Sequence, residues 1–156
     1  STQTGRRYLC LYLPERRRFS NSRLDSITRV TLLEPCAFYD EVLRDLEKNK
    51  EKCWGVSFGG GTSRMEEVCI KLYIDEEKEP YILNRLYREG RGGEIMKIRE
   101  NQFLYTGTFF DTNEMLSWVK TFTGRIMDIQ GTNFFSIAKI TRDWEKMYEM
   151  YCGNEE

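Results

Sequence analysis

Residues 66–131 carry a succession of strand and helix patterns that few folds can accommodate. Within 68–74 every second residue is Val, Ile or Leu, as in a strand with one buried face. A helix pattern then begins at Pro80 and ends at Gly90, since proline suits the first helical position and glycine the position after the last. Two strand patterns follow, at 95–99 and 103–110, and their short separation predicts a hairpin.

A second helix pattern completes the series. Asp111 stands three residues before Glu114, the spacing of a capping box, and Gly124 follows the apolar positions Met115, Trp118, Val119 and Phe122. A short strand is expected at 126–129. The order β-α-β-β-α-β predicts an α+β protein with a split, ferredoxin-like arrangement. A last amphipathic helix at 133–151 must pack on the sheet, on the preceding region or on another copy of the chain.

A smaller β-structure is expected in residues 1–35. Tyr8–Leu13 is almost continuously apolar and ends at Pro14, which predicts a buried strand and then a turn. A returning strand is expected within Arg23–Leu33. Because a two-stranded ribbon is marginal in water, we expect further strands of this β-domain upstream. Residues 36–65 then form a charged connector with helical spacing over 37–52, and 66–153 form the ferredoxin-like region.

The N-terminal segment is strongly basic. Residues 1–30 contain seven arginines and two acidic residues, a net charge of +5, whereas the whole chain has a net charge of −1. Such an asymmetry favours an anionic partner.

Composition argues against several other classes of protein. The chain has no histidine and five widely spaced cysteines without a C-x-x-C pair, so neither a zinc site nor a disulfide framework is indicated. We expect no metal and no cofactor. No apolar run approaches the roughly 20 residues of a membrane helix, and a cytoplasmic protein without membrane contact is expected. Without histidine an enzyme would have to rely on carboxylates, lysine or cysteine alone, and we expect a non-enzymatic protein. Gly59–Gly61 is not followed by the Lys-Ser/Thr of a phosphate-binding loop.

The motifs in both halves resemble the C-terminal part of bacterial WYL-domain transcriptional regulators. Such regulators combine a DNA-binding domain, a Sm-like (SH3-like) β-barrel named for a Trp-Tyr-Leu motif, and a ferredoxin-like extension called WCX. The naming motif corresponds here to Arg7-Tyr8-Leu9, and a second signature to Ser22-Arg23-Leu24-Asp25-Ser26-Ile27. The extension is matched by Val68–Ile74, Pro80–Arg85 and Met115–Gly124. Ser20 and Ser26 stand where the family often has arginine.

This resemblance implies a partial barrel followed by the extension, with an effector-sensing role in transcription regulation. It implies an anionic ligand, either a nucleotide or a single-stranded nucleic acid, and a homodimer. The candidate ligand-binding residues are Tyr8, Arg23, Asp25, Arg16, Arg17 and Arg18. Without a DNA-reading domain, residues 1–156 are not expected to bind an operator specifically.

Simpler interpretations of the same residues remain open. Arg23 and Asp25 could form only an ion pair, Tyr8 could be a core aromatic, and the arginine turn at 16–18 could be a solvated turn. The chain could also be a ligand-free dimerisation module. An acylphosphatase-like enzyme would need Arg91 or Arg64 beside Asn101, and no motif places them together; fold alone does not imply such an activity.

Overall fold

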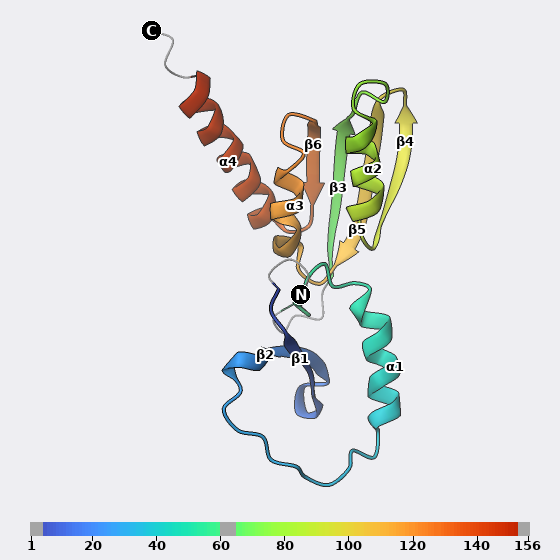
Figure 1. The fold of residues 1–156 in the computed structure, drawn as a ribbon, viewed down its shortest axis with the longest axis vertical. Coiled ribbons are helices and arrows are strands. Elements are labelled where there is room, and N and C mark those ends of the chain that lie inside the picture. The colour runs from blue at the N-terminus through green and yellow to red at the C-terminus, as the bar shows by residue number, and fades with distance from the viewer. Residues whose placement is uncertain (1–4, 60–64, 153–156) are drawn as a thin grey trace.

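The computed structural model describes residues 5–59 and 65–152, and it has an α+β architecture in two sheets (Figure 1). The N-terminal part consists of strands β1 (Tyr8–Leu13) and β2 (Arg18–Arg23), followed by helix α1 (Tyr39–Lys50). The remaining elements are β3 (Glu66–Tyr73), α2 (Pro80–Glu89), β4 (Gly93–Arg99), β5 (Gln102–Phe109), α3 (Leu116–Lys120), β6 (Ile126–Gly131) and α4 (Phe134–Cys152).

The second sheet has the strand order β4-β5-β3-β6, and all its neighbouring strands are antiparallel. Strand β5 therefore lies between β3 and β4, which are joined through α2. In the same way β3 lies between β5 and β6, which are joined through α3. This interleaving of two β-α-β units is the split ferredoxin-like arrangement, and it confirms the order expected from the sequence.

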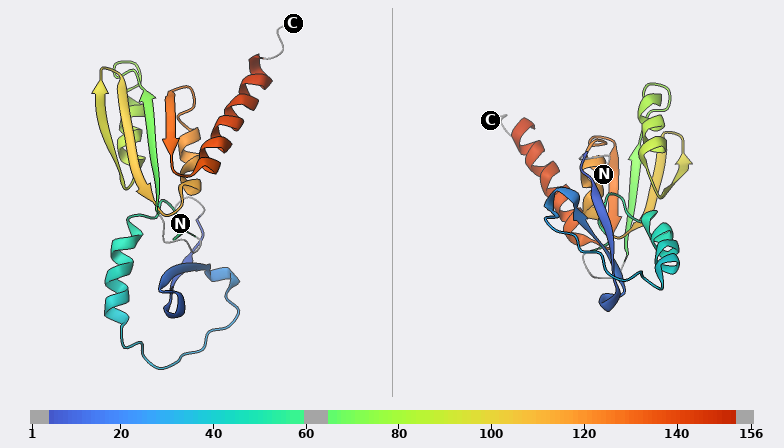
Figure 2. Two further views of the ribbon diagram at one scale, coloured as in Figure 1. Left: turned by 180° about the vertical axis from the view of Figure 1, so that it is seen from behind. Right: turned by 60° about the horizontal axis from the view of Figure 1, so that its bottom comes forward.

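Helices α2 and α3 cover one face of this sheet, and the opposite face is bare in the view from behind (Figure 2). The alternation in β3 explains the asymmetry, because Val68, Ile70 and Leu72 are buried while Glu67 and Tyr73 are exposed. Successive side chains of a strand point to opposite faces, so the apolar set meets the helices and the polar set lines the bare face.

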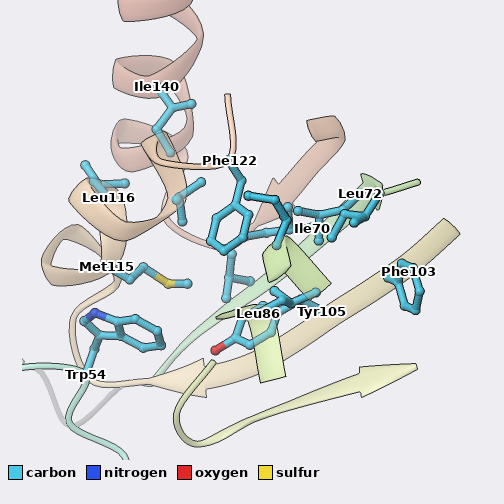
Figure 3. Packing of buried hydrophobic residues seen from close by; sticks show 14 of the residues in the cluster. Trp54, Ile70, Leu72, Leu86, Phe103, Tyr105, Met115, Leu116, Phe122 and Ile140 are labelled. Carbon is cyan, nitrogen blue, oxygen red and sulfur yellow. The ribbon is translucent and has the colours of Figure 1, made fainter. Parts of the chain in front are cut away.

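The core lies between the sheet and these helices, and it extends beyond them to the connector (Figure 3). Trp54, which follows α1, is only 6% exposed. Its ring lies 5.5 Å from that of Phe109 and 4.8 Å from that of Trp118, measured between centroids. The connector is therefore anchored in the core of the ferredoxin-like region, as a buried tryptophan in a charged segment suggests.

Two glycines of adjacent strands make room for core aromatics. Gly93 and Gly107 face each other in the β4–β5 ladder. A Cβ atom on Gly93 would lie 2.4 Å from the Tyr105 ring, and one on Gly107 would lie 2.4 Å from the Phe109 ring. Each ring therefore packs directly on the backbone of a glycine, in space that the Cβ atom of any other residue would occupy.

The second strand of the N-terminal hairpin differs from the expectation. It spans Arg18–Arg23 and pairs with β1 from Leu13↔Arg18 to Tyr8↔Arg23, whereas the apolar pattern placed it within Arg23–Leu33. No described residue pairs with the segment 27–37 as a strand. Leu32 and Leu33 are 93% and 86% exposed, so the pattern is strand-like, but the described residues offer it no partner strand.

The capping box at Asp111 forms only in part. The Asp111 side chain accepts a hydrogen bond from the Asn113 backbone N–H at 3.0 Å, and a short 3-10 turn, Thr112–Met115, precedes α3. Glu114 does not return to the Asp111 N–H among the described contacts. Its carboxylate instead contacts the connector, which the local spacing could not reveal.

Helix α4 packs on the rest of the protein through its first half, where Ser136 and Ile140 are buried and Trp144 packs against the core. Nε1 of Trp144 also donates to the Thr123 hydroxyl at 3.0 Å. Beyond this point the helix runs away from the sheet (Figure 1). Its second half exposes Tyr148, Met150 and Tyr151. In the part of the chain that the structure describes, no helix is both long and apolar enough to cross a membrane.

Candidate functional site

The hairpin brings Tyr8 and Arg23 together at its open end. The two residues are directly opposite in the β1–β2 register, so their side chains lie on the same face. The arginine turn, Arg16–Arg18, lies at the closed end of the hairpin. Strands of six residues separate the two ends by about 16 Å at 3.3 Å per residue. The structure therefore divides the candidate residues into two basic groups.

Arg23 is engaged by Asp25, which lies in a 3-10 turn, Leu24–Ser26, directly after β2. Nε of Arg23 donates to Oδ1 of Asp25 at 2.9 Å, and Nη2 donates to Oδ2. The pair is partly open to solvent, with side-chain exposures of 40% and 60%. The hydrogen bond from Arg23 lowers the pKa of Asp25. Any anion bound by this guanidinium group would therefore have to compete with Asp25 or use the remaining edge of the group.

The three arginines of the turn have different environments. Arg16 and Arg17 are exposed, and Arg17 has a left-handed backbone with φ of 46°. Arg18 is half-buried, and its Nε atom is buried without a hydrogen-bond partner among the described residues. Ser20 lies on the opposite face of the hairpin from Arg23, since the two are separated by three positions along β2.

The face of the hairpin that carries Tyr8 and Arg23 also packs against the connector. Asn21 Nδ2 donates to the carbonyl oxygen of Val56 at 2.6 Å. A series of ring contacts continues through the connector, with centroid distances of 6.3 Å for Phe38–Tyr12, 5.3 Å for Tyr12–Phe19, 5.5 Å for Phe19–Phe58 and 6.0 Å for Phe58–Phe110. We call these five rings the aromatic series; they join the hairpin to the end of β5.

An apolar groove of about 440 Å³ lies between the hairpin and α1. Its walls include Tyr12 and Phe19 from the hairpin and Phe38, Val42 and Leu46 from α1 and its lead-in. The helical spacing of the last three was visible in the sequence, but the surface they face was not.

The connector is held from the other side by Glu114. Its carboxylate accepts hydrogen bonds from the backbone N–H groups of Gly55, Val56 and Ser57, all at 3.0–3.1 Å. A Cβ atom on Gly55 would lie 2.7 Å from Oε1 of Glu114, so a larger residue there would displace the carboxylate. This arrangement, the Glu114 clasp, fixes the connector to the start of α3.

Glu66 forms a second polar cluster at the start of β3. Its Oε2 accepts from the backbone N–H of Thr112 at 2.8 Å and from the Thr112 hydroxyl at 2.6 Å, and Asn133 Nδ2 donates to the same carboxylate at 3.0 Å. Desolvation by burial raises the pKa of Glu66, but these hydrogen bonds outweigh it and the net shift is downward. Glu67 points to the other face, so the two acids do not form an acid–base pair.

We expect the stability of the protein to fall in acid partly through Glu66. Because its folded-state pKa is lowered, Glu66 stabilises the fold above about pH 4.3, the pKa of an unperturbed glutamate, and this contribution is lost as the pH falls through the folded-state pKa. Urea unfolding between pH 3 and 7 should show a shallower acid loss for Glu66→Gln than for the native protein. Glu67→Gln is the matched control, and an unchanged slope for Glu66→Gln would contradict the assignment.

The groups nominated for acylphosphatase-like chemistry are not brought together. Arg91 precedes β4 and Asn101 follows it, so they lie at opposite ends of a seven-residue strand, and Oδ1 of Asn101 accepts from the Glu76 backbone N–H. Arg64, with Gly60 and Gly61 of the triple glycine, lies outside the described residues. All five cysteines are free, and the described residues contain no cluster of three His, Cys, Asp or Glu side chains that could hold a metal ion.

No protein-family model matches the chain, and no curated protein matches it either.

Proposed function

We propose that the chain is the effector-sensing and dimerisation region of a bacterial transcriptional regulator of the WYL-domain class. In this proposal the hairpin binds an anionic nucleotide or a short single-stranded nucleic acid. The observation that carries the proposal is the direct pairing of Tyr8 with Arg23 on one hairpin face. An aromatic ring can stack on a base, while a neighbouring guanidinium group suits the adjoining phosphate.

The way the hairpin is attached supports a sensing role. A ligand at Tyr8 and Arg23 would touch the face that also carries Asn21, Tyr12 and Phe19. Through Val56 and the aromatic series, that face contacts the ferredoxin-like region. Binding could change the arrangement of a dimer only if the ligand has different affinities for two arrangements.

Titration of a fluorescein-labelled single-stranded oligonucleotide tests the proposal. We expect binding at low salt that weakens as salt is raised, because phosphate contacts release counterions. Arg23→Ala should weaken binding, and Arg29→Ala, which removes the same charge from the exposed segment after the hairpin, should have a smaller effect. Asp25→Asn should strengthen binding, since it frees the Arg23 guanidinium group.

Two outcomes would contradict the proposed ligand site. One is the absence of binding at low salt. The other is equal binding by Arg23→Ala and Arg29→Ala, which would reduce the interaction to nonspecific attraction by the basic segment.

A ligand-free assembly module is the second candidate function, and the exposed apolar side chains of α4 favour it. Phe134 and Phe135 are 79% and 90% exposed at its start, and Tyr148, Met150 and Tyr151 are exposed near its end. Large exposed apolar patches mark interaction surfaces. A dimer at all concentrations in analytical ultracentrifugation, with no melting shift on adding oligonucleotide, would favour this function over sensing.

A further inference from the structure

The bare face of the ferredoxin-like sheet contains a polar groove of about 500 Å³. The row Glu94–Thr106–Cys69–Gln130 crosses all four strands in register. All four side chains lie on the face opposite the core, because their strand neighbours Ile70 and Tyr105 are buried in it. The groove runs over this row and towards Glu67 and Thr108, the next pair along β3 and β5.

Lys52 also lines the groove, and a backbone hydrogen bond holds it beside the sheet. The carbonyl oxygen of Lys52 accepts from the Phe110 N–H at 3.0 Å, directly after β5. The lysine therefore comes from the connector, whereas the other lining groups come from the sheet. The groove lies where the two meet, and its volume is within the range of 300–1,000 Å³ that is typical of small-molecule sites.

Charges of both signs line this groove without neutralising one another. Lys52, Glu67 and Glu94 all contribute to its lining, yet none of the three side chains forms an ion pair or hydrogen bond with another described residue. Elsewhere the protein pairs opposite charges that lie close, as in Arg125–Glu79 and Lys97–Glu76. The hydroxyl groups of Thr106 and Thr108 are likewise without a described hydrogen-bond partner.

From this arrangement we infer that the groove binds a small zwitterion, a free α-amino acid. Its carboxylate pairs with Lys52, its ammonium group with Glu67 or Glu94, and the threonine hydroxyls supply further hydrogen bonds. A purely anionic ligand would face two carboxylates, and a purely cationic one would face the lysine. A zwitterion matches both signs, and charge-assisted hydrogen bonds are the strong ones. This site is separate from the hairpin and does not rest on the proposed nucleotide binding.

Differential scanning fluorimetry followed by isothermal titration calorimetry, with each of the twenty free amino acids, tests the inference on the full 156-residue chain. We expect one or a few amino acids to raise the melting temperature and to bind. The matching amine without a carboxylate and the matching acid without an amine should not bind. Lys52→Gln should weaken binding about tenfold or more, the loss expected from one charge-assisted hydrogen bond. Glu67→Gln or Glu94→Gln should cause a similar loss, according to which carboxylate holds the ammonium group.

Lys71→Gln is the matched control, because Lys71 lies on the same face of β3 but does not line the groove. It should bind the amino acid as the native protein does. The inference is overturned if none of the twenty amino acids binds at millimolar concentration. It is also overturned if the amine or acid analogue binds equally well, or if Lys52→Gln has no more effect than Lys71→Gln.

Discussion

Replacing Glu114 by alanine is expected to lower the free energy of unfolding by about 3 kcal/mol, the scale of charge-assisted hydrogen bonds lost together with the cost of unpaired donors. The carboxylate of the Glu114 clasp accepts from three consecutive backbone N–H groups. These groups belong to an irregular segment and have no strand or helix partner. Water can replace the carboxylate only where the half-buried segment opens. The connector should therefore loosen as well.

Urea unfolding monitored by tryptophan fluorescence measures this effect, since Trp54 directly precedes the clasped segment. Glu114→Gln should have an intermediate stability, because its amide retains one acceptor oxygen. Glu145→Ala is the matched control: Glu145 is exposed on α4, and its side chain forms no hydrogen bond or ion pair with another described residue. Equal stabilities of Glu114→Ala and Glu145→Ala would show that the clasp does not stabilise the fold.

Replacing Trp54 by alanine is expected to have a comparable or larger effect, about 3–5 kcal/mol. The side chain is only 6% exposed, and it packs on Phe109 and Trp118. Its loss leaves a cavity at the junction of the connector and the core. We expect the surroundings to relax only partly into this cavity, as is usual for a large-to-small change in a core.

Thermal and urea unfolding of Trp54→Ala, monitored by circular dichroism, test this expectation. Trp54→Phe should lose less, because it keeps an apolar ring at the site. Tyr81→Ala provides the control, since Tyr81 is 63% exposed on α2 and its loss should change stability by less than about 1 kcal/mol. A Trp54→Ala protein as stable as Tyr81→Ala would mean that the connector is not part of the core.

Local sequence patterns were enough to predict the order of strands and helices in the ferredoxin-like region, because each element has a pattern that is complete within a few residues. The alternation around Ile70, Pro80 before α2 and Gly90 after it are each visible within a few residues. The Glu114 clasp was not visible, because its donors lie 57–59 residues earlier in the chain. The capping-box spacing instead suggested a local role for the same carboxylate.

The hairpin shows where such patterns mislead. Val30, Leu32 and Leu33 look like a strand, yet a strand forms only where a partner offers backbone groups, and β2 begins earlier, at Arg18. Tyr8 and Arg23, both candidate ligand-binding residues, lie opposite each other in the hairpin, and their role in binding stays a prediction. The sequence prediction placed the arginine turn in the same site as Tyr8 and Arg23, because these residues are close in sequence. In the hairpin, however, the turn and the pair lie at opposite ends. The polar groove was missed for another reason: Glu67, Cys69 and Thr106 alternate with core residues as any solvated strand face does.

The peptide group between Val56 and Ser57 forms a hydrogen bond through both its N–H and its carbonyl oxygen. Its N–H donates to Glu114, and its carbonyl oxygen accepts from Asn21. Hydrogen bonds in such a chain polarise one another, so each strengthens its neighbour. One peptide group thus links the hairpin, through Asn21, to the sheet region, through Glu114. The chemical shift of the Ser57 amide proton should therefore respond to a change in either hydrogen bond.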